Sequence, residues 1–371
     1  MRLSSTVPVG ALLYGIQYLP GAYAWGAAGH EIVATIAQMY LHPTVLPTLC
    51  EILDLPTSKC HIAAVATWAD QHRNQMRWSA PLHYVGSLDD FPSKTCAFPG
   101  PHLWAGRKGI NVLDGIQNTT KLLQDWVNED VSDAVASEAL KFLIHFMGDM
   151  HQPLHLTGRE RGGNSVKVQF GRRHTNLHSL WDGFLIAKAV RTVPRNYSQP
   201  LPYPQVEKAL RGTIYDPYIR RILWEGILNP WGEDLPKWLN CPTPAPTSNG
   251  GSGGGLLGMW ETIYTATAKV AQLFMKDGVD INPDGPVHGD EEAEGEGDDD
   301  LSPDDRPLLD LDKPEYAGVI EKEMIVEKLL AQGGIRLAGL LNYLFAHDNM
   351  GSRSPAPFLQ VVDSVKGWNG I

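Results

Sequence analysis

The stretch from Leu143 to Gly183 constrains this chain more than any other, because it places histidines and carboxylates at helical intervals. His145 and Asp149 are four residues apart in a run with helical apolar spacing, so both should project from one face of a helix. Pro153 should end or kink that helix, because a proline removes a helical hydrogen bond. We therefore expect one helix to present an imidazole beside a carboxylate.

The same spacing recurs later in this stretch. His178 and Asp182 are again four residues apart, and His155 lies between the two pairs. A single pair could be an ordinary ion pair. Two pairs with a histidine between them favour a metal site, and imidazole together with carboxylate suits Zn²⁺.

Two earlier segments offer further ligands. His30 follows Trp25-Gly-Ala-Ala-Gly at the start of an expected helix through Gln38, where it could instead be an ordinary first-turn side chain. Asp70 lies in apolar surroundings on a helix that should begin near Ala63. A buried carboxylate is costly unless it is paired or binds a metal. The alternative for Asp70 is an ordinary exposed acid.

Residues close to Asp70 could contact a substrate. Arg73 lies one helical turn later and could bind a phosphate bidentately or simply pair with Asp70. The run Leu82 to Val85 should be a short extended segment that presents His83 and Tyr84 on opposite sides. Tyr84 could stack on a base or contribute to packing.

Residues 1–24 have the pattern of a secretory signal peptide, with a short buried segment as the alternative. Arg2 supplies the positive charge, Val7 to Leu19 is mostly apolar, and Ala22-Tyr23-Ala24 fits the cleavage site. Cleavage after Ala24 would leave Trp25 with a free α-amino group, whose pKa is near 8. That amine and the Trp25 carbonyl oxygen can together bind a metal.

We expect the mature protein to be secreted and soluble, since the apolar run is too short to span a membrane and no other long one follows. Four cysteines form an even set that suits an oxidising compartment and allows three connectivities. Proximity in the sequence favours Cys50–Cys60, which leaves Cys96 with Cys241. Two glycosylation sequons begin at Asn118 and Asn196.

The charge distribution argues against a generic basic surface for nucleic acids. The formal net charge is -11, and Asp290 to Asp300 alone contains eight acidic residues. A metal cluster can nevertheless attract phosphate, because bound cations are the largest local charges in such a site. Residues 277–312 are acidic and rich in Pro and Gly, which predicts a disordered insert, either a tolerated insertion or a regulatory or solubilising segment.

The remaining pattern predicts a mainly α, single-domain fold over residues 25–345, followed by a loose tail at 346–371. A short strand is expected over 165–170. The last expected helix, 321–345, should be broken by Gly333-Gly334-Ile-Arg336. Helices are expected over the following ranges: 114–128, 134–152, 206–228, 256–274 and 321–345.

Taken together, the motifs resemble the secreted zinc-dependent single-strand nuclease family of fungi and plants. The resemblance covers nearly all of the chain after residue 24, except the acidic insert and the tail. The segments that carry it are WGAAGH ending at His30, TWAD ending at Asp70, LHY around His83, HFMGDMHQPLH from His145 to His155, GGN ending at Asn164, HSLWD from His178 to Asp182, and GGIRLAGLLN ending at Asn342.

The resemblance implies a helical fold of the phospholipase C and single-strand nuclease type, with three zinc ions in a cleft. It implies the Cys96–Cys241 pairing as well. The first zinc would bind Asp70, His83, His145 and Asp149. The second would bind the Trp25 amine and carbonyl, His30 and the bridging Asp149. The third would bind His155, His178 and Asp182.

The family also implies the reaction, which is hydrolysis of single-stranded DNA and RNA to products with 5′-phosphates, in some members alongside 3′-nucleotidase activity. Metal ions would activate water, and Asp70, Arg73 and Asp149 would be the catalytic residues, with Arg73 offsetting charge on the phosphate. Asn164 would lie near phosphate, and Tyr84 near a base. One departure is Gly86, where family members often have an Asp that binds a base, so base preference is left open.

Two other functions fit parts of the pattern. A zinc phospholipase C has a similar fold and metal cluster, but it places its first His farther from the N-terminal Trp and usually ends its ligand set with Glu. Here the interval from Trp25 to His30 is short and the last ligand is Asp182. A protein that keeps zinc only for stability would favour Cys and His ligands in closed tetrahedra. Both comparisons favour a nuclease, which we expect to act as a monomer on single-stranded nucleic acids and nucleotides.

Overall fold

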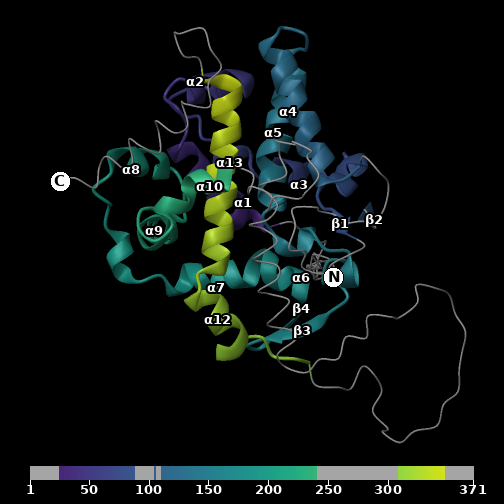
Figure 1. Ribbon diagram of the computed structural model, residues 1–371, viewed down its shortest axis with the longest axis vertical. Helices are drawn as coiled ribbons and strands as arrows, with labels where there is room; N and C mark the ends of the chain where they lie inside the picture. The colour runs from purple at the N-terminus through teal and green to yellow at the C-terminus, as the bar shows by residue number, and fades with distance from the viewer. Residues whose placement is uncertain (1–24, 88–103, 106–109, 240–307, 347–371) are drawn as a thin grey trace, which may run out of the picture.

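The computed structural model describes residues 25–87, 104–105, 110–239 and 308–346 (Figure 1). Several predictions from the sequence lie outside these residues. They are the signal peptide at 1–24, the helix at 256–274, most of the acidic insert, the tail after residue 346, and both cysteines of the Cys96–Cys241 pair.

The mainly α prediction is confirmed, because helices of very different length make up most of the described chain. The α-helices are α1 (Ala27–Met39), α2 (Val45–Ile52), α3 (Trp68–His72), α4 (Val112–Val127), α5 (Asp133–Asp149), α6 (Leu177–Ser179), α7 (Leu185–Thr192), α8 (Pro204–Leu210), α9 (Asp216–Ile222), α10 (Leu235–Leu239), α12 (Val319–Lys322) and α13 (Ile325–Phe345).

Two small antiparallel sheets complete the fold. β1 (Gly86–Ser87) pairs with β2 (Trp104–Ala105), and β3 (Lys167–Phe170) pairs with β4 (Arg173–Asn176). The hairpin turns at Gly171, whose φ of 60° is one that glycine adopts without strain. β4 continues directly into α6, so the hairpin fixes where α6 begins.

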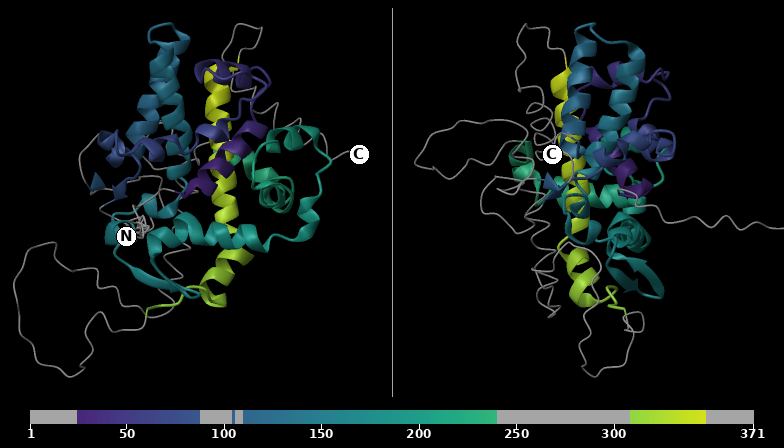
Figure 2. Two further views of the ribbon diagram at one scale, coloured as in Figure 1. Left: turned by 180° about the vertical axis from the view of Figure 1, so that it is seen from behind. Right: turned by 90° about the vertical axis from the view of Figure 1, so that its right-hand side faces the viewer.

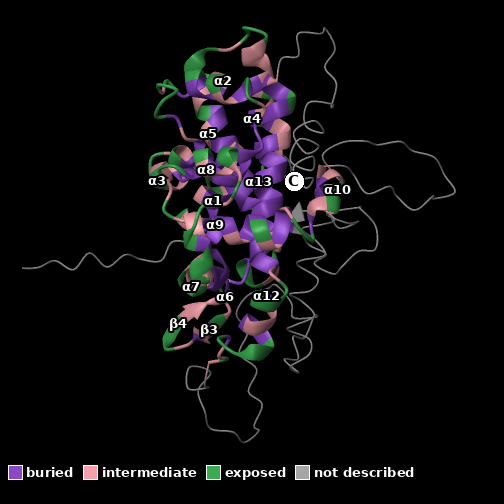
Figure 3. Ribbon diagram, turned by 90° about the vertical axis from the view of Figure 1, so that its left-hand side faces the viewer, coloured by how far each residue is buried: buried purple, intermediate pink, exposed green. Residues whose placement is uncertain are grey.

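Three helices that are far apart in the sequence form the centre of the core. α1, α5 and α13 pack against one another, and α4 lies alongside α5 (Figures 1 and 2). Figure 3 shows α13 as an almost continuously buried helix. A helix that is buried on most sides needs tertiary packing rather than amphipathic spacing to define it.

Two glycines in α13 make this close packing possible, and they correct one prediction. α13 runs unbroken through Gly333 and Gly334, where the sequence predicted a break. A Cβ on Gly334 would lie 2.5 Å from Ile36 Cγ2, and one on Gly333 would lie 3.2 Å from Val33 Cγ2. The glycines lower helix propensity, but they let the backbone of α13 approach α1.

Two other local predictions were wrong. The helix expected over 206–228 is divided into α8 and α9, because Gly212 takes a φ of 91° and α9 restarts with Pro217 in its first turn. The run Leu82 to Val85 is not extended throughout, since a 3₁₀ helix spans Arg77–Leu82 and strand pairing begins only at Gly86.

A buried arginine joins the end of α5 to α13 and α10. Arg336 Nη1 donates to His151 Nε2 at 2.8 Å, and Arg336 Nε donates to the Trp238 carbonyl at 2.9 Å. His151 Nδ1 in turn donates to the Met147 carbonyl at 2.7 Å. Burial lowers the pKa of Arg336 to about 9. These contacts fix the chain just beyond Asp149.

Cys50 and Cys60 form the disulfide that proximity in the sequence favoured. Among the described residues, none of the helices is long and apolar enough to cross a membrane.

The close approach of α13 to α1 can be tested with Gly334→Ala. Alanine normally stabilises a helix interior, yet here its Cβ would overlap Ile36, so we expect a loss of about 1–3 kcal/mol in the free energy of unfolding. The matched control is Gly318→Ala, whose Cβ would lie 3.6 Å from its nearest neighbour. Thermal unfolding that is equal in the two variants would contradict this account.

Candidate metal centre

Three groups of metal-binding side chains lie at the ends of α1, α3, α5 and α6. In each group the potential ligand atoms lie within 4.8 Å of one another. The groups are His30 with Asp70 and His145; His83 with His145 and Asp149; and His155 with His178 and Asp182.

Asp149 belongs to the second group and also lies close to His30 and His145 of the first. Its Oδ1 is 3.4 Å from His30 Nε2, and its Oδ2 is 3.0 Å from His83 Nδ1 and 3.4 Å from His145 Nε2. His145 Nε2 also lies 3.6 Å from Asp70 Oδ1. The two oxygens of Asp149 therefore face different histidines, which is the arrangement expected of a carboxylate that bridges two cations.

The third group has its own geometry. His178 Nε2 lies 3.4 Å from Asp182 Oδ2, and the rings of His155 and His178 stack with centroids 4.9 Å apart. α6 widens into a π-helical turn over Leu180–Phe184, which carries Asp182. The structure thus brings His155, His178 and Asp182 together.

Backbone carbonyls orient three of these histidines. The Nδ1 atoms of His145, His155 and His178 donate to the carbonyls of Ala66, His83 and Gly162 at 2.7, 2.6 and 2.6 Å, respectively. A carbonyl can only accept, so each Nε2 is left with its lone pair, and such carbonyl contacts are typical of metal-binding histidines.

The ligand atoms themselves are buried without hydrogen bonds. His30 Nε2, His145 Nε2, His155 Nε2 and Asp149 Oδ1 have no hydrogen-bond partner among the described residues. Buried polar atoms are rarely left unsatisfied in proteins. The clustering of these unsatisfied atoms therefore fits a site that binds cations.

Two residues that sequence reasoning missed shape the site. Gln152 Nε2 donates to Asp182 Oδ1 at 2.6 Å, which links the segment after Asp149 to the third group. Gly148 leaves room for His30, because a Cβ at this position would lie 2.4 Å from His30 Nδ1. Both lie inside the motif that contains His145 and Asp149, but their contacts come from distant segments.

Burial shifts the pKa values of these groups so that their neutral forms are favoured. Burial raises the pKa of Asp149 well above its usual value, while His145 lowers it and Asp70 raises it to smaller extents. Burial likewise raises the pKa of Asp182. Burial, and then the charges of neighbouring histidines, lower the pKa values of His30 and His155. Neutral imidazoles are the form that binds metals.

Trp25 lies beside the third group. It is buried, and the amide of the next residue, Gly26, donates to the Asp182 carbonyl at 2.7 Å. A Cβ on Gly29 would lie 2.6 Å from Trp25 Cβ, so the first turn of α1 encloses the tryptophan closely. The start of the described chain is therefore held next to metal-binding residues.

The predicted substrate residues surround the metal groups less closely. Arg73 is half-buried at the end of α3, where its amide donates to the Asp70 carbonyl at 3.3 Å. Tyr84 directly follows His83 and is 52% exposed. Asn164 Nδ2 donates to the Arg161 carbonyl in the turn that also positions His178.

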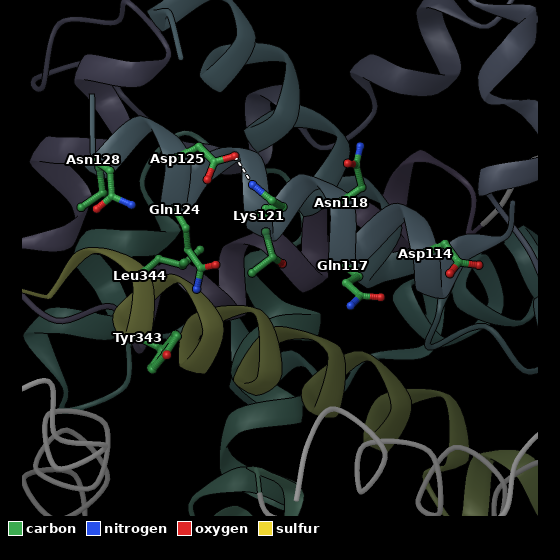
Figure 4. Close-up of a pocket in the computed structure, with 11 residues that line it drawn as sticks. Asp114, Gln117, Asn118, Lys121, Gln124, Asp125, Asn128, Tyr343 and Leu344 are labelled. Carbon is green, nitrogen blue, oxygen red and sulfur yellow. Dashed lines mark hydrogen bonds and ion pairs between the residues drawn. The ribbon is translucent and has the colours of Figure 1, made fainter. Parts of the chain in front are cut away.

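A separate groove of about 810 Å³ lies between the outer face of α4 and the end of α13 (Figure 4). Its lining includes Asn118, Lys121, Asp125 and Tyr343, and Lys121 pairs with Asp125 within it. None of the predicted metal ligands lines this groove. Asn118 and Asn196, the sequon asparagines, are both exposed.

The S1/P1 nuclease family model matches residues 25–222 of this chain. Endonuclease 4 of Arabidopsis thaliana is 30% identical over 346 residues, which cover 89% of this chain and 92% of that protein. Nuclease P1 of Penicillium citrinum is 37% identical over 168 residues, which cover 45% of this chain and 60% of that protein. Nuclease S1 of Aspergillus oryzae is 34% identical over 178 residues, or 47% and 58% of the two chains.

The chain belongs to the S1/P1 nuclease family. It is therefore a hydrolase that acts on phosphodiester bonds of nucleic acids. The match begins at Trp25 and includes every predicted metal ligand from His30 to Asp182. In this nuclease the His and Asp groups are the candidate metal centre.

Gly148 directly precedes Asp149, and Gly183 directly follows Asp182. Alanine substitutions at these two glycines give a matched test of the candidate metal centre. Gly148→Ala should displace the His30 ring, lower the bound metal by about one ion per chain and reduce nuclease activity. Gly183→Ala should change neither, because nothing lies within 4 Å of its Cβ position. Equal metal content by elemental analysis in the two variants would contradict the role of Gly148.

The raised pKa of Asp149 predicts that Asp149→Asn stabilises the metal-free protein, although it removes a proposed metal ligand. A raised pKa means that stability is fully present below the usual carboxyl value of 3.8 and is lost as the pH rises through the folded-state value. In chelated protein, Asp149→Asn should therefore raise Tm at pH 8, and the gain should shrink as the pH falls. With metal present the same variant should lose activity. A lower Tm for the chelated variant at pH 8 would be inconsistent with an unfavourable buried charge.

Proposed function

We propose that this chain is a secreted nuclease that binds three zinc ions and hydrolyses single-stranded DNA and RNA to products with 5′-phosphates. The observation that carries the proposal is the meeting of three His and Asp groups around buried, unsatisfied ligand atoms. The names of its relatives, Nuclease P1, Nuclease S1 and Endonuclease 4, agree with nucleic acid as the substrate. We further propose that it acts as a monomer and also has 3′-nucleotidase activity.

The zinc assignment rests on the chemistry of the ligands. A set of imidazoles and carboxylates without thiolates suits Zn²⁺, and carboxylate-rich sites with open positions are typical of catalytic rather than structural zinc. Asp70, His83 and His145 would hold one ion, His30 a second, and Asp149 would contact both. The third would be held by His155, His178 and Asp182. Bound zinc lowers the pKa of water and polarises a phosphoryl oxygen.

The residues of the chain would prepare the phosphate for attack. Arg73, at the end of α3 close to Asp70, would bind phosphate oxygens and offset the charge that accumulates during in-line displacement. Asn164, held against the turn beside His178, would donate to a phosphate oxygen. Tyr84 exposes its ring next to His83 and would stack on a base.

Secretion and the start of the mature chain belong to the same proposal. Residues 1–24 have the composition of a signal peptide, and the family match begins at residue 25. Removal of those residues would free the Trp25 amine beside the ligand groups, where it and its carbonyl would complete the set of the second zinc. The Cys96–Cys241 disulfide and glycans at Asn118 and Asn196 would follow from the same compartment.

The proposed function is tested by zinc content and product analysis on the secreted protein. We expect three zinc ions per chain and release of 5′-mononucleotides from single-stranded DNA and RNA, with loss of both on chelation. Three zinc ions without nucleotide release would refute the substrate. One ion or none would refute the ligand assignment.

The role of Trp25 predicts a strong effect of one added residue. A protein with a residue fused ahead of Trp25 should lose most of its activity and about one zinc ion, because its amine becomes a poorly ligating amide. Proteolytic removal of the added residue should restore both, which makes each preparation its own control. Full turnover by the extended protein would exclude ligation by the N-terminus.

A further inference from the structure

Among the candidate metal ligands, Asp70 and His83 have the most exposed side chains. The side chains of Asp70 and His83 are 13% and 12% exposed, whereas those of His30, His145 and Asp149 are fully buried. Asp70 and His83 bracket the segment 71–82, and both of their side chains contact ligands on α5. The surface that this segment forms therefore lies next to the two most exposed ligands.

Trp78 is the most conspicuous side chain of that segment. It is 59% exposed, and its ring packs in a tilted contact on Phe142, with centroids 5.6 Å apart. One side of the indole is thus supported by α5 while a large part of it faces solvent. An exposed, rigidly supported aromatic ring is the feature by which proteins stack bases of single strands.

The position of Trp78 relative to the metal centre follows from α5. Phe142 lies one turn before His145, about 4.5 Å along the helix axis, and the same aromatic row continues to Phe146, whose ring is 5.1 Å from Phe142 and 5.3 Å from His83. A stacked strand advances about 3.4 Å per nucleotide. A strand with one phosphate at the metal groups therefore reaches Trp78 within a few nucleotides.

Positive charges accompany this aromatic surface in an otherwise acidic chain. Arg77 precedes Trp78 and is exposed, and Lys141 Nζ lies 5.2 Å from the ring centroid of Trp68, which also packs on Phe142. Aromatic rings interleaved with cations match the alternation of bases and phosphates in a single strand. Tyr84, on the other side of His83, offers a second exposed ring.

Resting on the proposed function, we infer that Trp78 is a base-stacking residue of an extended binding site, which holds a nucleotide beyond the two that flank the phosphate at the metal centre. Long single strands gain this contact and dinucleotides do not. Trp78 thereby favours internal cleavage of long strands over short products. Because stacking on an aromatic ring tolerates every base, the contact confers a preference for length rather than for sequence.

The test compares two substrates on the zinc-loaded enzyme, a 12-nucleotide oligothymidylate and the thymidine dinucleotide. Trp78→Ala should raise KM for the 12-mer about tenfold with kcat retained, and leave KM for the dinucleotide unchanged. Trp78→Phe should restore the 12-mer KM to within about twofold. The control is Trp224→Ala, because Trp224 is also exposed, at 42%, but follows α9, which lies on the other side of α13 from α3 in Figure 1.

The outcomes separate this inference from the proposed function. A wild-type enzyme that cleaves neither substrate would overturn both. Wild-type cleavage with an unchanged 12-mer KM in Trp78→Ala would overturn the inference alone. An equal loss on both substrates, or a fall in zinc content, would also overturn it, since Trp78 would then support the metal ligands rather than the strand. Tm and zinc content of each variant identify that last case.

Discussion

The buried carboxylate of Asp149 is the interaction on which the rest of the structure depends. Three histidines from three different segments surround it, and burial raises its pKa well above the usual value. An ionised carboxylate in such a place needs cations to offset its desolvation. Metal ions can supply that charge, whereas neutral imidazoles cannot. The folded chain therefore concentrates unfavourable electrostatics at one point, and metal binding relieves them.

The helical core holds this carboxylate in place. α5 carries both His145 and Asp149, and α1 contributes His30. α13 packs against both helices, and its two glycines allow its close approach to α1. Beyond Asp149, Arg336 fixes His151, and Gln152 contacts Asp182. The short segment after Asp149 thus connects two of the ligand groups and is held in place by a hydrogen bond from α13. Hydrogen bonds of this kind, made to the ligands or to their neighbours in the chain, hold the ligands in a geometry suited to a metal ion.

The candidate metal ligands are shielded unevenly from solvent. The side chains of His30, His145 and Asp149 are fully buried, while those of Asp70 and His83 are partly exposed. In the proposed function, the helices would hold the metals and the segment between Asp70 and His83 would contact the substrate, which is a common division between scaffold and recognition surface.

The sequence by itself determined two His–Asp pairs of the candidate centre, because His and Asp at helical spacing require only the local geometry of a helix to come together. His145 with Asp149 and His178 with Asp182 could be predicted for that reason, as could the mainly α fold. Only the tertiary structure decided why Gly333 and Gly334 do not break α13, why Gly148 must lack a side chain, and which ring Trp78 rests on. Each of these depends on an atom from a segment far away in the chain. Close packing between helices can outweigh the low helix propensity of a residue such as glycine. The sequence pattern of a single segment does not contain that information.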